Sequence, residues 1–482
     1  GASNTSVGQG SMEANTTGTQ NVAVGSLALI ANTTANNNTA VGYFAMNSNT
    51  SGTQNTAVGS SALNANTTAA NNSAFGYNAL GANTTGASNV GIGQFSLDAN
   101  TTGSLNTALG HNALTANIGS GLNTAVGAGA MELNTSGDYN TAVGRNALSA
   151  NTTANQNVAV GMEALLSNTT AADNTALGYQ ALRANTTATN NTAVGAGALR
   201  STVTGAGNTA LGTASQYAST GASNTSVGMN SMRYNTSGGD NTAIGFSALD
   251  ANTTASDNTA VGSSALGSNT TGSGNISMGN SSGGAITTGD SNTCLGRSAG
   301  VSIQTGTHNT LIGHSVDCAH DSDNAIVLGV DVTGQGDNFK FGKTSNVVSN
   351  VFTTNASWAR SSDVNKKTNI EDDSLGLSFI NNLRTVKFNW RPNSEFPKHY
   401  NDYSETENYM DTDVRLHGMI AQEVKAALDV EGVDTFGGWL EDEDGSQRIS
   451  QEMFVHPLIK AVQELSTQVD ELKQELLALK GE

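Results

Sequence analysis

Hydroxyl, carboxylate and amine side chains gather within seven residues of the chain, in the segment 361–367. A serine hydroxyl becomes a good nucleophile when a base removes its proton, and a lysine that burial has deprived of its own proton can act as that base. A neighbouring carboxylate could orient either group. In isolation, however, a serine five residues before a lysine is too common to indicate a site, and a surface turn before a helix explains it better. The residues concerned are Ser361, Ser362, Asp363, Lys366 and Lys367.

The chain changes its composition near this segment. Upstream of it there is no proline, and the first lysine is Lys340. Of the 482 residues, 37% are hydrophobic, 5% are aromatic and 56 are glycine. Such low hydrophobicity is typical of disordered chains, but charged residues are also scarce, at 12%. Because Asn, Thr, Ala and Gly recur upstream in a fixed order, periodicity must supply the fold there.

Charge and hydropathy exclude several classes of partner. The net charge of -19 argues against binding to nucleic acid, which requires clustered lysine and arginine that the upstream part lacks. No apolar stretch of about 18 residues is present, so we predict no membrane span. Nothing indicates a cofactor. The chain begins within its repeat pattern, at Gly1, and we expect a further N-terminal segment, which would hold any anchor, to precede it.

A unit of seventeen residues recurs from Asn4 to Asn309, with one single-residue deletion between Asn208 and Asn224. We number the positions of the unit from its first asparagine. A fixed period of this length is the signature of a solenoid or array. The unit, as in residues 55–71, reads Asn-Thr-Ala-Val-Gly-x-x-Ala-Leu-x-x-Asn-Thr-Thr-Gly/Ala-x-x.

Positions 2 to 4 of the unit alternate in the manner of a β-strand. Position 2 is Thr or Val and position 4 is Val, Leu, Ile or Phe, as in Val22 and Val24, and we expect this face to point inward. Position 3, as in Ala40, then points the other way, toward a second surface. A second short strand is expected for the Ala-Leu pair, and Asn-Thr-Thr is expected to form the return turn. The frequent glycines oppose a helix.

One unit is therefore one coil of a β-solenoid. At about 4.8 Å per coil, nineteen or so coils would give a rod of roughly 90 Å. Such a coil is thin and buries little apolar surface by itself. We therefore predict a homo-oligomer, most favourably a homotrimer around the rod axis. An interwound triple β-helix satisfies the same pattern.

The repeat resembles the coils of trimeric autotransporter adhesin heads, whose units also run Asn-small-apolar-Ala-apolar-Gly, and it is similar to repeats of phage tail-fibre proteins. The resemblance covers about residues 1–330, although the seventeen-residue period is longer than the adhesin unit. It implies a trimeric, extracellular, surface-contacting rod.

Position 6 varies freely beside this constant scaffold, and variable positions on a scaffold are where recognition often lies. A solvated, unconstrained column is the simpler explanation. Stacked threonines could also bind ice, although any threonine-rich solenoid has them. Asn-Thr-Thr is a glycosylation sequon as well, but we interpret it as a turn. The candidate ligand ladder at position 6 comprises Tyr43, Tyr77, His111, Arg145, Tyr179, Phe246 and Arg297.

Metal and disulfide chemistry find little support. Between residues 308 and 321 three histidines, two aspartates and a cysteine lie close together, but their spacing matches no strong metal motif. A capping coil with solvated polar groups explains them better, and we predict no metal. The two cysteines, Cys294 and Cys318, form no framework and are interpreted as small buried residues.

Downstream of residue 361 the chain resembles the intramolecular chaperone domain of phage tailspikes and tail fibres, the endosialidase type, which is classed as a self-cleaving serine peptidase. The resemblance covers residues 362–482. The segments that carry it are Ser362 to Ile370, Phe379 to Trp390, Gly418 to Val424 and Leu458 to Leu479.

This resemblance implies roles for the residues at the junction. The nucleophile of the family falls on Ser362, its lysine base falls on Lys367, and the scissile bond lies between Ser361 and Ser362. Asp363 would orient one of the two groups. The family often has arginine where this chain has Asn365, and Lys366 offers a second amine. Cleavage would be a single turnover, and no multiple-turnover enzyme is expected.

The last helix has a physical argument of its own. Its apolar residues alternate four and three apart, which is the seam of a coiled coil. Valine and leucine at alternate seam positions would by themselves favour a parallel dimer, so the trimer rests on the rod and on the resemblance. An amphipathic helix packed on its own domain is the alternative. The seam residues are Leu458, Val462, Leu465, Val469, Leu472, Leu476 and Leu479.

The expected organisation is a solenoid rod over 1–329, a β-rich neck over 330–361, a chaperone domain over 362–456 and a coiled-coil helix over 457–482. A likely hairpin turn falls at Asp444-Gly445. The first functional hypothesis is a phage tail fibre, located in the virion, that contacts a host receptor, possibly a glycan, and whose C-terminal domain brings the chains into register. The alternative is a trimeric adhesin on a bacterial surface. An enzyme acting on glycans would need paired acids, which the rod does not suggest.

Overall fold

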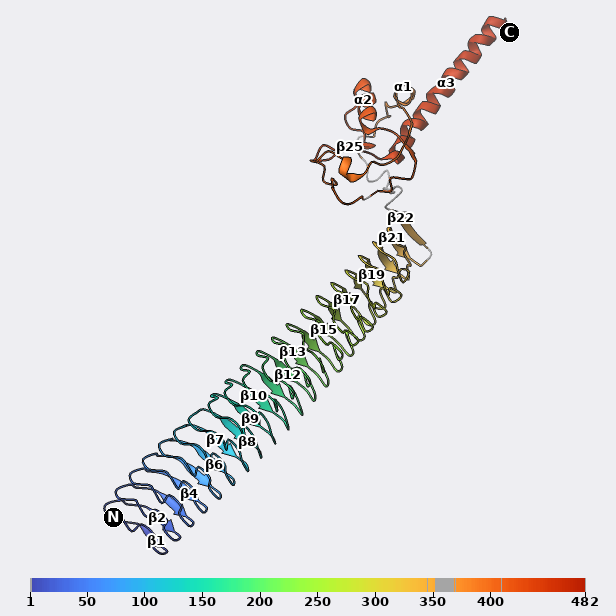
Figure 1. The fold of residues 1–482 in the computed structure, drawn as a ribbon. Coiled ribbons are helices and arrows are strands. Elements are labelled where there is room, and N and C mark those ends of the chain that lie inside the picture. Colours follow the sequence, from blue (N-terminus) through green and yellow to red (C-terminus); the bar gives the residue numbers. More distant parts are fainter. Residues whose placement is uncertain (1, 345, 352–367, 369, 409, 482) are drawn as a thin grey trace. The chain divides into compact units, whose positions relative to one another are not determined.

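A computed structural model describes the chain except for residues 1, 345, 352–367, 369, 409 and 482 (Figure 1). It consists of two compact units, Gly1–Gly336 with Lys340–Val347, and Asp337–Phe339 with Val348–Glu482.

The first unit is a stack of coils, each with one short strand. Strands recur every seventeen residues because position 1 of each unit precedes a β-forming triplet and glycine follows it. The strands are β1 (Thr5–Val7), β2 (Val22–Val24), β3 (Thr39–Val41), β4 (Thr56–Val58), β5 (Ser73–Phe75), β6 (Val90–Ile92), β7 (Thr107–Leu109), β8 (Thr124–Val126), β9 (Thr141–Val143), β10 (Val158–Val160), β11 (Thr175–Leu177), β12 (Thr192–Val194), β13 (Thr209–Leu211), β14 (Thr225–Val227), β15 (Thr242–Ile244), β16 (Thr259–Val261), β17 (Ile276–Met278), β18 (Thr293–Leu295), β19 (Thr310–His314) and β20 (Ile326–Val330). Two further strands, β21 (Asn338–Lys343) and β22 (Asn346–Val351), contain residues of both units.

From β1 to β20 each strand pairs in parallel with the next, and equivalent residues of the repeat lie side by side. Thr39 pairs with Thr56, for example, and Val41 with Val58. The shortened unit does not disturb this register, since Thr209 still pairs with Thr225. The predicted β-solenoid with its seventeen-residue coil is confirmed.

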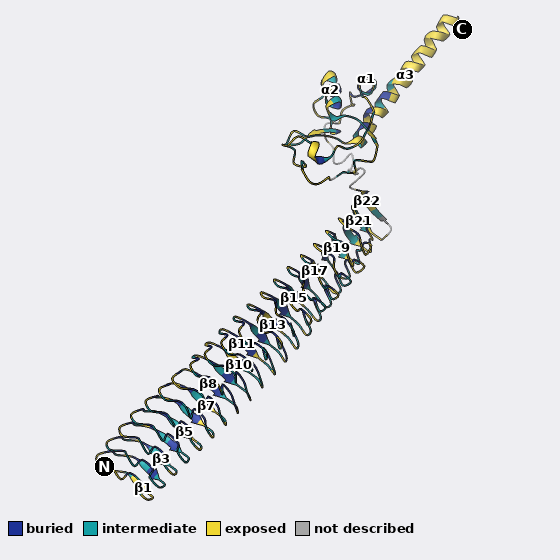
Figure 2. Ribbon diagram, viewed as in Figure 1, coloured by how far each residue is buried: buried dark blue, intermediate teal, exposed yellow. Residues whose placement is uncertain are grey.

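The two faces of the strand are the reverse of our prediction. The alanine at position 3 is fully buried, as at Ala57 and Ala108, whereas positions 2 and 4 are half-buried or exposed (Figure 2). The reason is space inside the coil. At Gly91, which replaces this alanine, an added Cβ would already lie 3.1 Å from Ser96 Oγ and 3.3 Å from Leu80 Cγ. The narrow interior therefore takes small side chains from the strand, and the larger ones point out.

The predicted second strand is wrong as well, because the Ala-Leu pair lies in a turn. Leu63 is fully buried and has a positive φ of 50°, and Ser61, two residues before it, has a φ of 58°. Left-handed backbone is unfavourable for a bulky residue, and the sequence gives no sign of it. Burial of the leucine or methionine side chain at this position against the alanines of the strand offsets this cost in the coils from Met12 to Leu199.

Two columns of buried asparagines connect the coils. Asn55 at position 1 donates its backbone N–H to Asn38 Oδ1 at 3.0 Å, and its side chain donates to the Ala69 carbonyl at 2.9 Å. Asn66 at position 12 donates to that same carbonyl at 3.1 Å and to Asn49 Oδ1 at 2.9 Å. The side-chain amides of both columns therefore link each coil to its neighbour by hydrogen bonds. The Asn-Thr-Thr segment is a turn, and its buried Asn66 side chain is not available to a sugar.

The short coil that begins at Asn208 interrupts the core. Apolar packing forms one cluster from Met12 to Ala210 and a second from Met232 to Val332. Between them Gln216 stands at position 9, where the other coils from Met12 to Gly300 have leucine, methionine or, at Gly283 and Gly300, glycine. Its Nε2 donates to Asn208 Oδ1 at 2.9 Å, but its buried Oε1 has no partner.

Replacing Gln216 by leucine is expected to stabilise the rod. The change removes a buried acceptor that has no donor, which costs roughly 1–3 kcal/mol, and adds apolar contact. Asn208 Oδ1 keeps its bond from the Asn224 N–H at 3.0 Å. We expect a higher midpoint of urea unfolding. The matched control, Leu182→Gln at the same position of a regular coil, should lower it. An unchanged midpoint for Gln216→Leu would contradict this account of the short coil.

The second unit is a small α+β domain that ends in a long helix, as predicted. Its core surrounds Phe379, whose ring stacks on Phe454 at 6.2 Å and meets Phe436 edge to face. The predicted hairpin is present, since β25 and β26 pair antiparallel around Asp444 and Gly445. The elements are α1 (Leu377–Asn381), β23 (Val386–Phe388), the 3-10 turn η2 (Asn393–Glu395), β24 (Leu416–Gly418), α2 (Ala421–Glu431), β25 (Trp439–Glu441), β26 (Gln447–Ile449), the 3-10 turn η3 (Gln451–Phe454) and α3 (Val455–Lys480).

Candidate functional site

Helix α3 is fixed to its domain at one end. Pro457 and Ala461 in its first turns are buried. Glu464 Oε2 accepts a hydrogen bond from the Leu377 backbone N–H, at the start of α1, over 2.7 Å. An acidic group at that helix N-terminus is favourable, because the first N–H groups of a helix have no partner within it. The direction of α3 is therefore set by its own domain.

The predicted seam of α3 is uncovered. Its seven residues are between 41% exposed, at Val469, and 85% exposed, at Leu479, and the distal turns of the helix are exposed all round (Figure 2). The alternative that this helix packs its apolar stripe on its own domain is therefore excluded beyond the first turns. A stripe of this length needs a partner.

Charges beside the seam indicate how helices would pair. With Val462 and Val469 at position a of the heptad and Leu465 at position d, Glu475 takes position g and Lys480 position e of the next heptad. In a parallel coiled coil these two positions of neighbouring helices face each other. Opposite charges there favour a parallel arrangement, which the sequence reasoning had not used.

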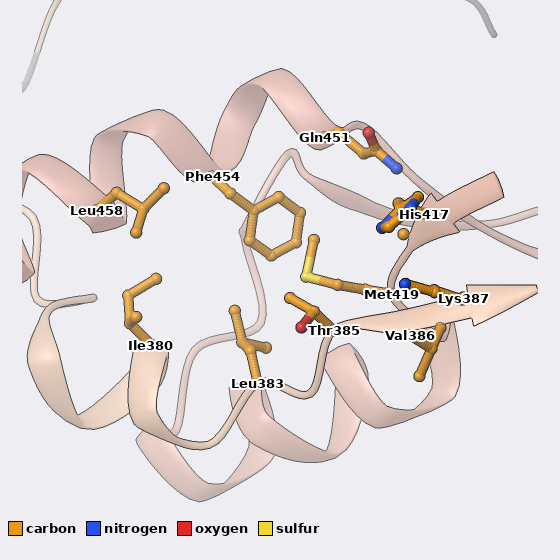
Figure 3. A pocket seen from close by; sticks show the side chains of 11 residues that line it. Ile380, Leu383, Thr385, Val386, Lys387, His417, Met419, Gln451, Phe454 and Leu458 are labelled. Atoms are coloured by element: carbon orange, nitrogen blue, oxygen red, sulfur yellow. The ribbon is translucent and has the colours of Figure 1, made fainter.

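A groove of about 640 Å³ opens beside the base of α3 (Figure 3). Its wall is apolar and comes from three separate segments, and Leu458 of the seam belongs to it. Lys387, His417 and Gln451 line its polar end. A wall of this kind suits the insertion of an apolar side chain. Its apolar residues are Ile380, Leu383, Met419, Phe454 and Leu458.

The residues predicted for cleavage fall outside the described part of the chain. This holds for Ser361, Ser362, Asp363 and Lys367. Their predicted roles therefore stay predictions.

The outward face of the rod carries a second uncovered apolar surface, which sequence reasoning missed because it placed this face inside. From β2 to β20, every side chain at position 4 is half-buried or exposed. We call this column the strand face. The larger side chains in it, each between 37% and 47% exposed, are Phe75, Ile92, Leu109, Leu177, Leu211, Ile244, Met278 and Ile312.

The candidate ligand ladder at position 6 is exposed along the rod. Tyr43, Tyr77, Tyr179 and Phe246 are between 49% and 54% exposed. Phe95, at position 7 of the intervening coil, lies between Tyr77 and His111, with ring centroids 5.4 Å and 6.5 Å away. This aromatic row was not predicted, because position 7 was not considered. Ligand binding by the ladder stays a prediction.

Two of the three histidines between residues 308 and 321 each lie beside a single acid. His314 Nδ1 lies 3.5 Å from Asp331 Oδ1, and His320 Nδ1 lies 3.1 Å from Asp321 Oδ1. Within the described residues, no three potential metal ligands come together. Cys294 and Cys318 are free and buried, and burial raises the pKa of each thiol to about 12. No described helix is long and apolar enough to cross a bilayer.

Comparison with known proteins finds a match within the C-terminal part. Residues 362–433 match the family described as chaperone of endosialidase, and the match begins at Ser362. It is preceded by the β-solenoid rod, as the resemblance implied. No curated protein matches the chain. No solved structure matches it.

Proposed function

We propose, from the premise that residues 362–433 are of the chaperone-of-endosialidase family, that the protein is a homotrimeric fibre whose C-terminal domain assembles and registers its chains. The observation that carries the proposal is the pair of uncovered apolar surfaces, the strand face of the rod and the seam of α3. Contiguous apolar surface of this extent marks an interaction site. Copies of the same chain offer the same two surfaces and can cover both.

A domain that acts before the rod is needed for a physical reason. Coils with nearly identical residues can meet a neighbouring chain one coil out of step almost as well as in step. The rod alone therefore specifies the register between chains weakly. Long-range strand pairing is also slow, and it exposes unpaired strand edges that are prone to aggregation during folding. Parallel α3 helices that associate first would bring three chains together in the same direction, and the rods could then associate.

Removal of residues 362–482 tests this proposal. We expect the truncated chain to aggregate or to remain unassembled, while the full chain forms a trimer by sedimentation equilibrium. If the truncated rod assembles into a soluble trimer at the same yield, the chaperone role is wrong. If the full chain is monomeric, the trimeric fibre is wrong.

The same domain is proposed to release itself by cutting the Ser361–Ser362 bond. Ser362 Oγ would attack the Ser361 carbonyl carbon while Lys367 takes the hydroxyl proton and passes it to the leaving Ser362 nitrogen. The resulting ester links the Ser361 acyl group to Ser362 Oγ. Water would hydrolyse this ester, which leaves a Ser361 carboxylate and restores the Ser362 hydroxyl. The start of the family match at Ser362 supports this assignment.

Cleavage is expected to yield a C-terminal fragment that comprises residues 362–482. Intact mass measurement of fresh protein should show this fragment for the unchanged chain and for Lys366→Ala. It should be absent from Ser362→Ala and Lys367→Ala, because each removes one member of the proposed pair. A fragment of the same mass from Ser362→Ala would rule out this nucleophile.

For the whole fibre we propose attachment to a host surface as part of a phage tail. Support comes from the family match and from the exposed, variable ladder on a regular scaffold. Binding of the assembled fibre to host cells, compared with that of Tyr43→Ala/Tyr77→Ala, tests this. Unchanged binding would remove these tyrosines from the contact, and no binding by the parent fibre would contradict attachment. A bacterial adhesin would instead show an anchor for the cell surface.

A further inference from the structure

The strand face of each coil has two different edges. Position 6, directly after the strand and its glycine, forms what we call the downstream edge. Positions 16 and 17, which precede the asparagine before the next strand, form the upstream edge. Both columns run the length of the rod, with the apolar strand face between them.

The two edges carry opposite charges. From Gln9 to Val330, the downstream edge contains Arg145 and Arg297 and no acidic residue. Over the same coils the upstream edge contains neither lysine nor arginine. Its acidic residues are Asp138, Asp173, Asp240, Asp257, Asp290 and Asp323.

The two arginines are also placed in the same way relative to aspartates at position 16. Arg145 follows Asp138 by seven residues, and Arg297 follows Asp290 by seven. A coil rises about 4.8 Å over seventeen residues, so seven residues correspond to a height difference of about 2 Å. Each arginine therefore lies at nearly the height of its aspartate, on the opposite edge.

Within one chain these groups do not pair. In the described residues, neither Arg145 nor Arg297 forms an ion pair. Arg145 is near Glu163, but the low pKa of that carboxyl is caused mainly by its hydrogen bonds from Arg183 and Gln180. Both arginines are exposed.

The aspartates have a local role that does not need their charge. Asp138 Oδ1 accepts from the Gly121 N–H at 2.7 Å, and Asp290 Oδ1 accepts from the Ser273 N–H at 2.6 Å. At the same position the neutral side chain of Asn155 makes an equivalent bond, since its Oδ1 accepts from the Asp138 N–H at 2.7 Å. The hydrogen bond to the backbone therefore explains why position 16 has an acceptor oxygen. It does not explain why Asp138 and Asp290 carry a negative charge there.

We infer that neighbouring copies of the rod meet by unlike edges, with Arg145 of one copy opposite Asp138 of the next and Arg297 opposite Asp290. This rests on the proposed assembly of copies and specifies its contact. A contact between two different edges repeats around a closed ring of parallel copies. The contact alone does not set the number of copies, which comes from the proposed trimer. The strand faces are then covered toward the ring centre, and the charged pairs lie at the joints between chains.

The pairs select one register. If one chain slips by a coil in either direction, Arg145 meets Gly121 or Asn155, and Arg297 meets Ser273 or Thr307, so both pairs are lost together. The inference also assigns these two arginines, originally members of the candidate ligand ladder, to a neighbouring chain. Tyr43, Tyr77 and the other aromatic members keep their proposed role.

Cysteine pairs joined by a short bis-maleimide linker test the inference on the full chain. The variant Asp138→Cys/Arg145→Cys should give a covalently linked trimer on a denaturing gel, because each joint supplies one cysteine from either edge. Asp290→Cys/Arg297→Cys should do the same at a second height. The matched control Arg145→Cys/Ala172→Cys uses the same edges with the upstream residue about 10 Å higher, two coils along, and should link at least tenfold less.

Single variants decide between unlike and like edges. Arg145→Cys alone should not link, whereas a mixture of Arg145→Cys and Asp138→Cys chains assembled together should. The native Cys294 and Cys318 are buried and should contribute little background. Linking by Arg145→Cys alone, or equal linking by the Ala172 control, would overturn the inference. A trimer in sedimentation that shows no link in either pair would overturn the inference alone, and a monomeric parent chain would overturn the proposed function with it.

Discussion

Replacing Leu465 and Leu472 together by aspartate is expected to abolish assembly of the chains. Both side chains are about half exposed or more in the single chain, at 49% and 62%, and both lie on the seam. Burying a leucine contributes roughly 1.5–3 kcal/mol, and a buried carboxylate without a partner is far less favourable. Three copies multiply both effects. Sedimentation equilibrium of the variant should report monomers or aggregates in place of a trimer.

The matched control places the same residue on the opposite side of α3. Thr467→Asp/Gln474→Asp changes two exposed positions that the seam does not use and adds the same two negative charges to the helix. This variant should assemble like the parent chain. Equal loss of assembly in both variants would mean that charge or helix stability, and not the seam, controls association.

Replacing Ala108 by leucine is expected to disrupt the coil that contains it. Ala108 is fully buried at position 3, where the interior has no space for a longer side chain. Overpacking costs roughly 1–3 kcal/mol in an ordinary core, and the rigid backbone on both sides of this coil should place the cost at the upper end or above it. Urea unfolding followed by circular dichroism should show a lower midpoint.

The neighbouring position on the outward face is the control. Thr107→Leu changes the side chain next to Ala108 in sequence, at position 2, which is half-buried on the same side of the strand as the strand face and would be covered in the assembled rod. We expect no loss of stability from this change. A larger decrease in the unfolding midpoint for Thr107→Leu than for Ala108→Leu would mean that positions 2 and 4 point inward, as the alternation of β-forming residues first indicated.

The sequence determined the coil but not its cross-section. The period of seventeen and the β-forming triplet were enough to predict a parallel solenoid, because repetition at constant spacing forces equivalent residues into one register. The direction of the faces was mispredicted, since hydrophobicity alone favours Val58 over Ala57 for the interior. The left-handed backbone at Leu63 decides the matter, and leucine carries no signal for that conformation.

For the C-terminal unit the sequence predicted the elements but not their meeting points. The seam of α3 follows from spacing alone, and its exposure agrees with that prediction. The groove could not be predicted, because Leu383, Met419 and Phe454 are brought together only by the fold of the domain. The proposed cleavage residues depend on the family match, since their spacing alone has no specific geometry.

Because of the asparagine columns, the length of the rod depends only on the number of its coils. Asn55 and Asn66 form hydrogen bonds that recur in nearly every unit. One more coil would therefore form the same hydrogen bonds with its neighbours as the coils already present. Duplicating a stretch of DNA that encodes seventeen residues would extend the rod by about 4.8 Å and leave the chemistry of every other coil as it was. Recombination between near-identical units can thus change the length of the rod in steps of one coil, while the C-terminal domain stays unchanged.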